Sequence, residues 1–401
     1  MAVSDWRKVL DAAIDNRFAE VVAVRRHLHA HPEPSGEERE TSQFIAAQLT
    51  RLGLSPRLAT SDGRGVLVDG GAAPGPRVAL RADIDCLKIH EQNQAPFCSK
   101  RPGLMHACGH DAHTATVFGA VLGLQALEAA GALPAPIAWR GIFQPAEETG
   151  QGAIEMVAAG AVDGVTTAFA AHVDPTRAVG RIGVRWGVFT ASCDDIDVKI
   201  VGRGGHAARP HETLDPVAAA ALWLNAFFIQ VPRGADSQES VVASVGHIVA
   251  GANRNVIPAH VELHGTLRTL DRTVREQTIA RIHQLSRGIA ETTGTQISVA
   301  IGGTVLSVQN NDACSDLLWK CGGEVLGEAN LDKIPRPSMG AEDFSGYLEH
   351  VPGAMFRLGC SSPEVGNSAL HTPTMGVDER ALAIGAKILA RAAVLAQTGP
   401  H

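Results

Sequence analysis

The chain has 401 residues, of which 45% are hydrophobic and 19% charged, and its formal net charge is -7. This length exceeds what one hydrophobic core usually supports, so we expect two domains. Acidic and basic residues are scattered, without the basic stripe that nucleic acid or an anionic membrane surface would select. The composition therefore argues against nucleic acid and membrane partners and favours a small-molecule partner.

The start of the chain and its cysteines predict a cytoplasmic protein. The start, MAVSDWRKVLDAAIDNRF, is charged and helix-like, without the apolar stretch and cleavage site of a secretory signal. No run approaches the roughly 18 apolar residues that a membrane-spanning helix needs. Seven cysteines without regular spacing argue against a disulfide framework and for a reducing compartment.

Helices and short apolar strands alternate through the first part of the chain. Ser35 and Glu38 form a capping-box pattern that predicts a helix from about 36 to 54, and an apolar run predicts a buried strand at 77–83. The next expected elements are a helix at 111–130, a strand at 137–144, a helix at 152–159 and a strand at 167–173. This alternation predicts an α/β fold with a parallel-rich sheet covered by helices.

From about Gly187 the strands instead alternate polar and apolar residues. The expected elements are strands at 191–204, 239–250, 259–270 and 296–303 and helices at 215–231 and 273–292. This pattern predicts an antiparallel sheet with helices on one side. The chain then returns to the first domain, with helices at 312–326 and 378–397 and a strand at 354–359. We therefore expect a domain of residues 1–187 and 304–401, interrupted by an α+β domain of residues 188–303.

Side chains that bind metals gather where predicted strands end. They are Cys108 and His110 in the loop MHACGHDAHT, Glu147 and Glu148 after one strand, His172 at the end of another, and Asp83 and Asp85 after a third. The carboxyl ends of parallel strands share one edge of a sheet, so we expect these residues to meet there. On an irregular turn, two adjacent glutamates can divide the work, one binding a metal and the other moving a proton.

Other kinds of site lack their patterns. The ligand spacing does not fit a structural zinc finger, GRGG at 202–205 is followed by no phosphate-binding lysine, and no G-x-S-x-G occurs. Dispersed nitrogen, oxygen and sulfur ligands instead suit a catalytic ion or ion pair. His27, His29 and His31 favour packing or solvent exposure over metal binding. Asp85 and Asp111 can support a metal ligand or cap a loop, and the sequence does not choose between these roles.

At this point the motifs resemble a known family, the M20 metallopeptidases, in their amidohydrolase branch of hippurate hydrolases, N-acyl-amino-acid deacylases and auxin-conjugate hydrolases. The motifs span most of the chain in the same order, and they are RRHLHAHPEPSGEE at 25–38, LRADIDCLKI at 80–89, MHACGHDAHTA at 105–115, QPAEETGQGA at 144–153, IVGRGGHAARPH at 200–211, NRNVIPAHVELHGTLR at 253–268, MGAEDF at 339–344 and LHTP at 370–373.

The resemblance implies a catalytic domain that binds two divalent ions per subunit, interrupted by a lid domain that also forms a homodimer or higher homo-oligomer. The implied metal ligands are Cys108, which would bridge the ions, His110, Glu148, His172 and His371. Glu147 would be the general base and Asp83 would support a metal ligand. Zinc or manganese is expected, and cobalt or nickel would suit the same ligands. Arg81 stands where the wider family has a histidine, and His110 would supply that imidazole.

The resemblance also implies roles for three residues of the second domain. His206, Asn255 and Arg268 match positions that contact the substrate carboxylate or the reaction oxyanion, with His206 acting across the dimer. An arginine can hold a carboxylate through two hydrogen bonds, so we expect Arg268 to bind the α-carboxylate of an amino acid. The expected reaction is hydrolysis of the amide bond of N-acyl-L-amino acids, such as N-acetyl or N-benzoyl compounds.

Two other functions fit the same motifs. A dipeptidase or aminopeptidase of this fold would need a pocket for a free amino group. A non-catalytic, metal-dependent binding protein could keep the fold, although the intact pair Glu147 and Glu148 argues against it. The sequence does not identify the acyl group.

Overall fold

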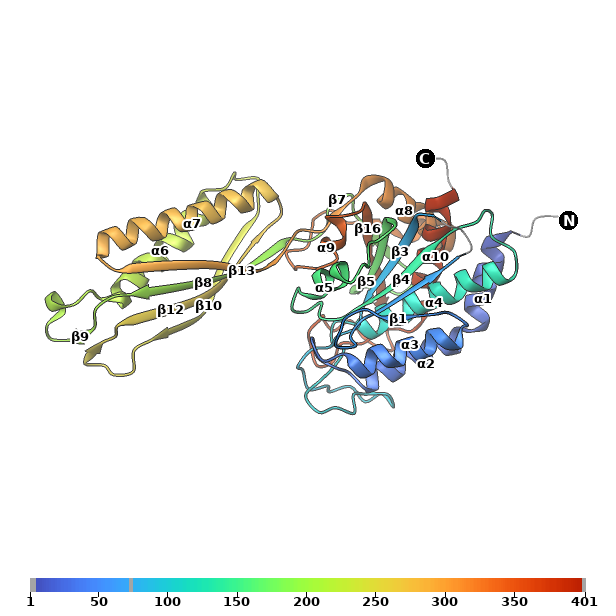
Figure 1. Ribbon diagram of the computed structural model, residues 1–401, viewed down its shortest axis with the longest axis horizontal. Helices are drawn as coiled ribbons and strands as arrows, with labels where there is room; N and C mark the ends of the chain where they lie inside the picture. The colour runs from blue at the N-terminus through green and yellow to red at the C-terminus, as the bar shows by residue number, and fades with distance from the viewer. Residues whose placement is uncertain (1–4, 72–74, 399–401) are drawn as a thin grey trace. The chain divides into compact units, whose positions relative to one another are not determined.

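The computed structural model describes residues 5–71 and 75–398, which form two compact units (Figure 1). Unit 1 contains the described residues up to Phe189, then Gln309–Arg336, and those from Asp343 onward. Unit 2 contains Thr190–Val308 and the short segment Pro337–Glu342. The boundaries between the units lie at 189/190 and 308/309, near the expected domain limits of 187 and 304. Unit 2 also includes Pro337–Glu342, which the sequence analysis placed in the first domain.

Unit 1 is built on an eight-stranded mixed sheet. Its strands, in spatial order, are β1 (Arg57–Leu58), β2 (Val66–Gly70), β4 (Trp139–Gln144), β3 (Arg77–Asp83), β5 (Val165–Ala178), β16 (Gly353–Ser361), β6 (Ile182–Val184) and β15 (Leu331–Lys333). The central strands β4, β3, β5 and β16 run parallel, and antiparallel pairs flank them. A further two-stranded sheet pairs β7 (Gly187–Val188) with β14 (Gln309–Asn310). The expected α/β class with a parallel-rich sheet is confirmed.

The helices of unit 1 bury the sheet because their inner faces are apolar. They are α1 (Trp6–Asn16), α2 (Phe18–Ala30), α3 (Arg39–Arg51), α4 (His110–Ala129), α5 (Gly152–Ala158), α8 (Asp312–Leu326), α9 (Ser345–Leu348) and α10 (Arg380–Thr398). The helices α4 and α10 pack on each other and on β3 and β5, and α1 and α2 pack on α4. By length and composition α10 could cross a membrane, but 61% of its apolar window is buried in unit 1, as in the core helix of a globular fold.

The predicted start of α3 is wrong. The helix begins at Arg39 rather than near residue 36, and Glu38 makes no side-chain cap. Ser35 Oγ donates to Asp85 Oδ2 at 2.6 Å instead, and Glu38 Oε1 accepts the N–H of Ala146 at 2.7 Å. Tertiary hydrogen bonds have therefore taken both side chains of the expected capping box.

Unit 2 is an α+β unit whose four-stranded antiparallel sheet has the order β10 (Val241–Ala250), β12 (His260–Thr269), β8 (Ser192–Val201), β13 (Gln296–Val305). A two-stranded pair, β9 (Gly205–His206) and β11 (Val256–Ile257), a short 3₁₀ turn (Pro210–Glu212), and the helices α6 (Pro216–Arg233) and α7 (Arg272–Thr293) complete it. Alternate residues of β8 are buried, as the polar–apolar pattern predicts, and Trp223 of α6 stacks on Phe227 in the core. The expected antiparallel sheet with two helices is confirmed.

A buried ion-pair network ties α2 to α4 in unit 1. His29 Nδ1 lies 2.9 Å from Asp111 Oδ2, and its Nε2 lies 3.1 Å from Glu91 Oε1. Because both partners are carboxylates, both ring nitrogens donate, which requires the imidazolium. Burial opposes the charge, but Asp111 outweighs burial and raises the pKa of His29 to about 9. Asp111 also accepts a hydrogen bond from Arg25, so it serves this network, and His29 has the packed role expected for it.

We expect His29 to make the stability of the metal-free protein depend on pH. Its pKa is about 9 when folded and 6.5 in the reference state, so its contribution is complete below pH 6.5 and is lost as the pH rises through 9. The shift corresponds to on the order of 3 kcal/mol. Chemical denaturation at several pH values should therefore show that His29→Gln destabilises most near pH 6 and least near pH 10. The exposed His350→Gln should change little at either pH, and a pH-independent loss in His29→Gln would contradict the assignment.

Candidate metal centre

The candidate metal ligands lie at the carboxyl edge of the central strands of unit 1. Glu147 and Glu148 follow β4, and His172 lies within the long strand β5. Cys108 and His110 lie where the chain enters α4. His371 comes from a turn near the end of the chain, where its N–H donates to the Ala107 carbonyl at 2.9 Å.

The structure brings all five expected ligands together. One side-chain atom from each of Cys108, His110 and Glu148 lies within 4.8 Å of the others. Cys108 Sγ is 3.6 Å from His172 Nε2. His371 Nε2 is 3.5 Å from Glu148 Oε1. Glu147 Oε2 lies 3.8 Å from His110 Nε2, so the expected general base borders the same cluster.

Unusual backbone conformations hold these residues. Among the described non-glycine residues, only Ala146 and His371 have positive φ, at 55° and 62°. Such residues are strained, and they cluster at functional sites. Gly109, at φ 87°, precedes α4, and a Cβ there would lie 2.5 Å from a Val173 methyl group, so the turn between the two ligands Cys108 and His110 requires glycine.

Asp85 orients two of the ligands. Its Oδ1 accepts a hydrogen bond from His110 Nδ1 at 2.9 Å, which turns Nε2 of that ring toward the cluster. Its Oδ2 accepts the backbone N–H of Glu148 at 3.0 Å and the hydroxyl of Ser35. A carboxylate that binds the second nitrogen of a ligand histidine is a common support of metal sites. The structure thus gives Asp85 the contacts of a supporting residue, which the sequence left open.

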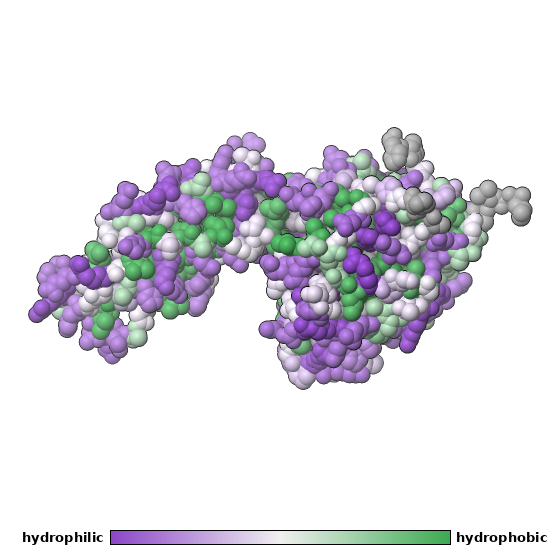
Figure 2. Space-filling view, in the orientation of Figure 1, coloured by the Kyte–Doolittle hydropathy of each residue, from purple (hydrophilic) through white to green (hydrophobic). Residues whose placement is uncertain are grey.

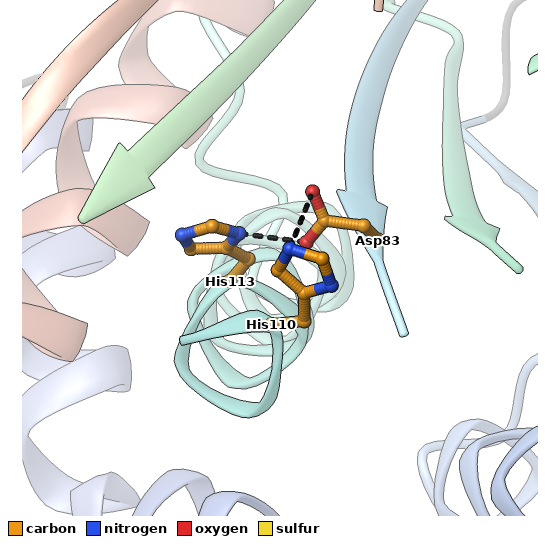
Figure 3. Close-up of side chains that lie close together, drawn as sticks. All are labelled: Asp83, His110 and His113. Atoms are coloured by element: carbon orange, nitrogen blue, oxygen red, sulfur yellow. Dashed lines mark hydrogen bonds and ion pairs between the residues drawn. The ribbon is translucent and has the colours of Figure 1, made fainter. Parts of the chain in front are cut away.

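Asp83 is fully buried and is held from several sides. Its Oδ2 pairs with Arg81 at 2.8 Å and lies 3.8 Å from His110 Nε2, and its Oδ1 bonds His113 Nδ1 at 2.6 Å (Figure 3). Arg81 also donates to Asp343 and Gln144. Burial opposes ionisation, but the charge of His110, the His113 ring that donates from Nδ1 and the charge of Arg81 outweigh it and hold the pKa of Asp83 well below its usual value. Arg81 thus neutralises a buried carboxylate.

Burial controls the protonation of the thiol and of Glu148. It raises the pKa of the Cys108 thiol, and it raises the pKa of Glu148 to about 7. An ion held by Cys108 and Glu148 would bind the thiolate and the carboxylate, so its binding would displace protons here.

The two buried ligand imidazoles have opposite environments. Burial favours neutral His110, but the charge of Asp83 outweighs burial and holds the pKa of His110 well above its usual value. For His172, burial and the nearby Arg357 cation both hold the pKa well below its usual value. His172 Nδ1 donates to the Val173 carbonyl at 2.8 Å, which leaves the lone pair at Nε2. That nitrogen faces Cys108, and its lone pair could bind a metal ion.

These side chains fit divalent metal ions. His110 Nε2 and Glu148 Oε1 are buried and have no hydrogen-bond partner within residues 5–71 and 75–398. Leaving buried polar atoms without partners costs about 1–3 kcal/mol each, so such pairs of atoms need an explanation. An ion bound between them would supply the missing partner, and a mixed set of imidazole, thiolate and carboxylate suits zinc or manganese.

The three residues expected on the lid lie in unit 2. His206 on β9 pairs in register with Val256 of β11, and the carbonyl of Asn255 accepts the Ala207 N–H at 3.1 Å. His206 and Asn255 are therefore exposed neighbours at one small two-stranded sheet. Arg268 lies near the end of β12, where its Nη1 donates to the Met339 carbonyl at 3.2 Å.

The structure places two residues, His113 and Glu38, around the candidate ligands, where the sequence did not predict them. His113 bonds Asp83, and Glu38 fixes the turn at Ala146. The signal for His113 was its spacing, because residues i and i+3 of a helix share a face and His110 is a ligand candidate. For Glu38 the local pattern suggested a helix cap, so the sequence offered no signal of its tertiary partner.

Comparison with known proteins agrees with this geometry. Residues 79–394 match Peptidase family M20/M25/M40. An N-acetyl-L-cysteine deacetylase of Bacillus subtilis is 38% identical over 365 residues, which cover 90% of this chain and 85% of the relative. An N-acyl-L-amino acid amidohydrolase of Geobacillus stearothermophilus is 40% identical over 287 residues, covering 70% and 75%. The crystal structure of Bacillus subtilis YXEP, a dinuclear metal binding peptidase from the M20 family, has a TM-score of 0.83 and 32% identity, covering 96% and 100%.

The fold and the ligand cluster are those of a metal-dependent hydrolase. The chain belongs to the M20 peptidase family, and the resemblance found in its motifs is confirmed. It is an enzyme of the peptidase and amidohydrolase type.

We expect metal binding to release a proton from Cys108, because burial keeps the thiol protonated and the ion binds thiolate. Calorimetric titration with zinc near neutral pH, in two buffers of different ionisation enthalpy, counts the protons released. Cys108→Ser should release about one proton fewer than the wild type. Cys321→Ala, which removes a buried thiol from α8, should release the wild-type number. Equal release in all three proteins would show that Cys108 is not a ligand.

Proposed function

We propose that this enzyme hydrolyses the amide bond of N-acyl-L-amino acids, producing a carboxylic acid and a free amino acid. The observation that carries the proposal is the position of Glu147 beside a cluster in which buried His110 Nε2 and Glu148 Oε1 have no hydrogen-bond partner among the described residues. Relatives that cover most of this chain are named for deacetylation of N-acetyl-L-cysteine and for hydrolysis of N-acyl-L-amino acids. We also propose that the partner is a small molecule and that the enzyme is located in the cytoplasm.

Two divalent ions, zinc or manganese first and cobalt or nickel as alternatives, would be held by Cys108, His110, Glu148, His172 and His371. When bound, such ions act as Lewis acids that acidify water and polarise a carbonyl oxygen. The protein's part is to hold five ligands in place, and the hydrogen bonds of Asp85 and Val173 fix the two buried imidazoles for that task.

Glu147 is the proposed general base. Its carboxylate accepts a proton from water as the oxygen attacks the amide carbon, and it then delivers that proton to the leaving nitrogen. One C–O bond forms and the C–N bond breaks, so water is divided between the acid and the amine. The strained turn at Ala146 lets the side chains of the two adjacent glutamates take different roles. Glu148 would be a metal ligand and Glu147 would carry the proton.

Unit 2 supplies the proposed substrate contacts. Arg268 would bind the α-carboxylate of the substrate with its planar guanidinium, and Asn255 and His206 would contact the substrate or the oxyanion. A residue that recognises an α-carboxylate favours substrates with a free carboxyl end over internal peptide bonds.

The geometry of unit 2 supports sharing these contacts between two subunits. His206 lies on β9 beyond the end of the sheet where Val201 pairs with His260, whereas Arg268 pairs with Cys193 at the other end (Figure 1). Arg268 comes eight positions after His260 along β12, which corresponds to roughly 27 Å of strand. This separation supports the proposal that one substrate takes its Arg268 contact and its His206 contact from different copies of the chain.

Unit 2 also carries surfaces suited to a second copy. β10 is an edge strand, and exposed edge strands readily pair with another chain. Large apolar side chains are 42–51% exposed on this strand and on α6, and they are Val242, Ile248 and Val249 on β10 and Val217, Leu222, Phe228 and Ile229 on α6. Figure 2 shows apolar patches between polar residues on unit 2. Exposed apolar patches of this kind mark interaction sites, and we propose a homodimer formed through unit 2.

Glu147→Gln tests the chemistry. The variant should bind metal as the wild type does and lose most turnover, by at least 100-fold in kcat, because a neutral amide does not accept the proton. Metal content by elemental analysis and hydrolysis of N-acetyl and N-benzoyl amino acids are the measurements. Glu155→Gln, a partly exposed glutamate of α5, is the matched control and should keep its activity.

The substrate panel separates the alternatives. Hydrolysis of N-acyl amino acids with little cleavage of dipeptides supports the proposal. Preferential cleavage of dipeptides would identify a dipeptidase or aminopeptidase instead, and metal binding without turnover of either class would identify a binding protein.

Mixed dimers test the shared site. His206→Ala and Arg268→Ala proteins should each be nearly inactive alone, because each dimer lacks one contact in both sites. After subunit exchange, half of the dimers carry one variant of each kind, and one of their two sites is complete. Activity should then rise to about a quarter of wild type in a statistical mixture of symmetric dimers. A mixture that stays inactive after proven exchange would place both residues in the same chain's site.

A further inference from the structure

His113 occupies the junction between three elements that carry the metal centre. It lies on the first turn of α4, three residues after His110, and only 3% of it is exposed. Its ring centroid is 5.4 Å from that of His110 and 4.6 Å from that of His172. Figure 3 shows it beside His110, with Asp83 reaching both rings from the end of β3.

Both ring nitrogens of His113 are used within the protein. Nδ1 lies 2.6 Å from Asp83 Oδ1, and Nε2 lies 2.9 Å from the backbone nitrogen of Val173. A backbone N–H only donates, so Nε2 must accept, and the ring proton must therefore be on Nδ1, where the carboxylate accepts it. His113 consequently has no lone pair left for an ion, although one of its ring nitrogens lies within 4.8 Å of possible ligand atoms of Asp83 and His110.

The bond to Val173 reaches His172, a proposed metal ligand, through a single residue. His113 fixes the N–H of Val173, and the carbonyl of the same residue accepts the Nδ1 proton of His172 at 2.8 Å. That second bond turns His172 Nε2 toward Cys108. The series of contacts thus runs from Asp83 through His113 and Val173 to His172.

The bond to Asp83 stabilises the other side of the centre. Asp83 is the last residue of β3, and its second oxygen pairs with Arg81 and faces His110 Nε2 at 3.8 Å. His113 holds the first oxygen and so fixes the carboxylate plane. One side chain therefore links a carboxylate beside one ligand to the backbone that orients another.

We propose that His113 is a positioning residue of the metal centre, which sets the geometry of His172 and of Asp83 without binding an ion itself. This inference rests on the proposed metal centre but does not depend on the identity of the substrate. Losing a supporting partner of a metal ligand commonly weakens metal binding by 10- to 100-fold. Replacing any buried side chain also lowers the stability of the protein, so the test must separate an effect on metal binding from an effect on stability.

Three substitutions separate the two hydrogen bonds. His113→Asn places an amide near the Nδ1 position and can keep the bond to Asp83. His113→Gln reaches toward the Nε2 position and can accept the Val173 N–H. His113→Ala removes both bonds. Thr116→Val is the matched control, because Thr116 is also buried on α4 and its hydroxyl has no hydrogen-bond partner among the residues that the structure describes.

The measurement is zinc affinity of the full-length protein, by competition with a chromophoric chelator in the absence of substrate. We expect the dissociation constant of His113→Ala to rise 10- to 100-fold, with partial recovery in Asn or Gln. In the cobalt-loaded protein, the absorption band from the Cys108 thiolate should shift in His113→Ala and stay unchanged in Thr116→Val. Unfolding of the metal-free proteins reports stability separately.

Wild-type zinc affinity and cobalt spectrum in folded His113→Ala would overturn the proposal. The zinc affinities of the Ala, Asn and Gln variants could also fall in parallel with the stability of the metal-free proteins, with no recovery in Asn or Gln. That result would make His113 a packing residue and would also overturn the proposal. So would failure of all three variants to fold. Because no substrate enters the measurement, a wrong substrate assignment leaves the result intact, whereas wild-type protein that binds no zinc would instead refute the metal centre itself.

Discussion

The buried carboxylate of Asp85 is the interaction on which the metal centre depends. It accepts hydrogen bonds from the ring of His110, from the backbone of Glu148 and from the hydroxyl of Ser35, so three distant segments share one side chain. The hydrogen bonds to His110, Ser35 and the Glu148 N–H outweigh burial and hold the pKa of Asp85 below its usual value. A buried charge with this many donors is costly to disturb, because each lost donor leaves part of the charge unsolvated.

Backbone conformation and hydrogen bonding fix two of the turns that carry the candidate ligands. Ala146 and His371 adopt left-handed conformations that cost on the order of 1–3 kcal/mol each. The hydrogen bonds of Glu38 to Ala146, and of His371 to Ala107, hold these two strained positions. These hydrogen bonds fix the turns that carry Glu147, Glu148 and His371.

Much of this could be predicted from the sequence, for identifiable reasons. The strands β3, β4 and β8 follow from local apolar patterns, and the meeting of Cys108, Glu148 and His172 follows from the rule that parallel strands share an edge. His371 was found only through family motifs, because it lies in a turn without a local pattern. The start of α3 was wrong because Ser35 and Glu38 bond to residues 50 and 108 positions away, which no local rule includes.

The order of strands in unit 1 has a consequence for synthesis. β16 lies between β5 and β6, yet it comes from residues 353–361, after the whole of unit 2 has been made. Until that strand leaves the ribosome, the nascent chain exposes two unpaired strand edges and lacks His371. The four-stranded sheet of unit 2 is complete at Val305, so unit 2 can fold before unit 1 has received β16. A chain that ends before residue 353 would therefore lack the strand that joins β5 to β6.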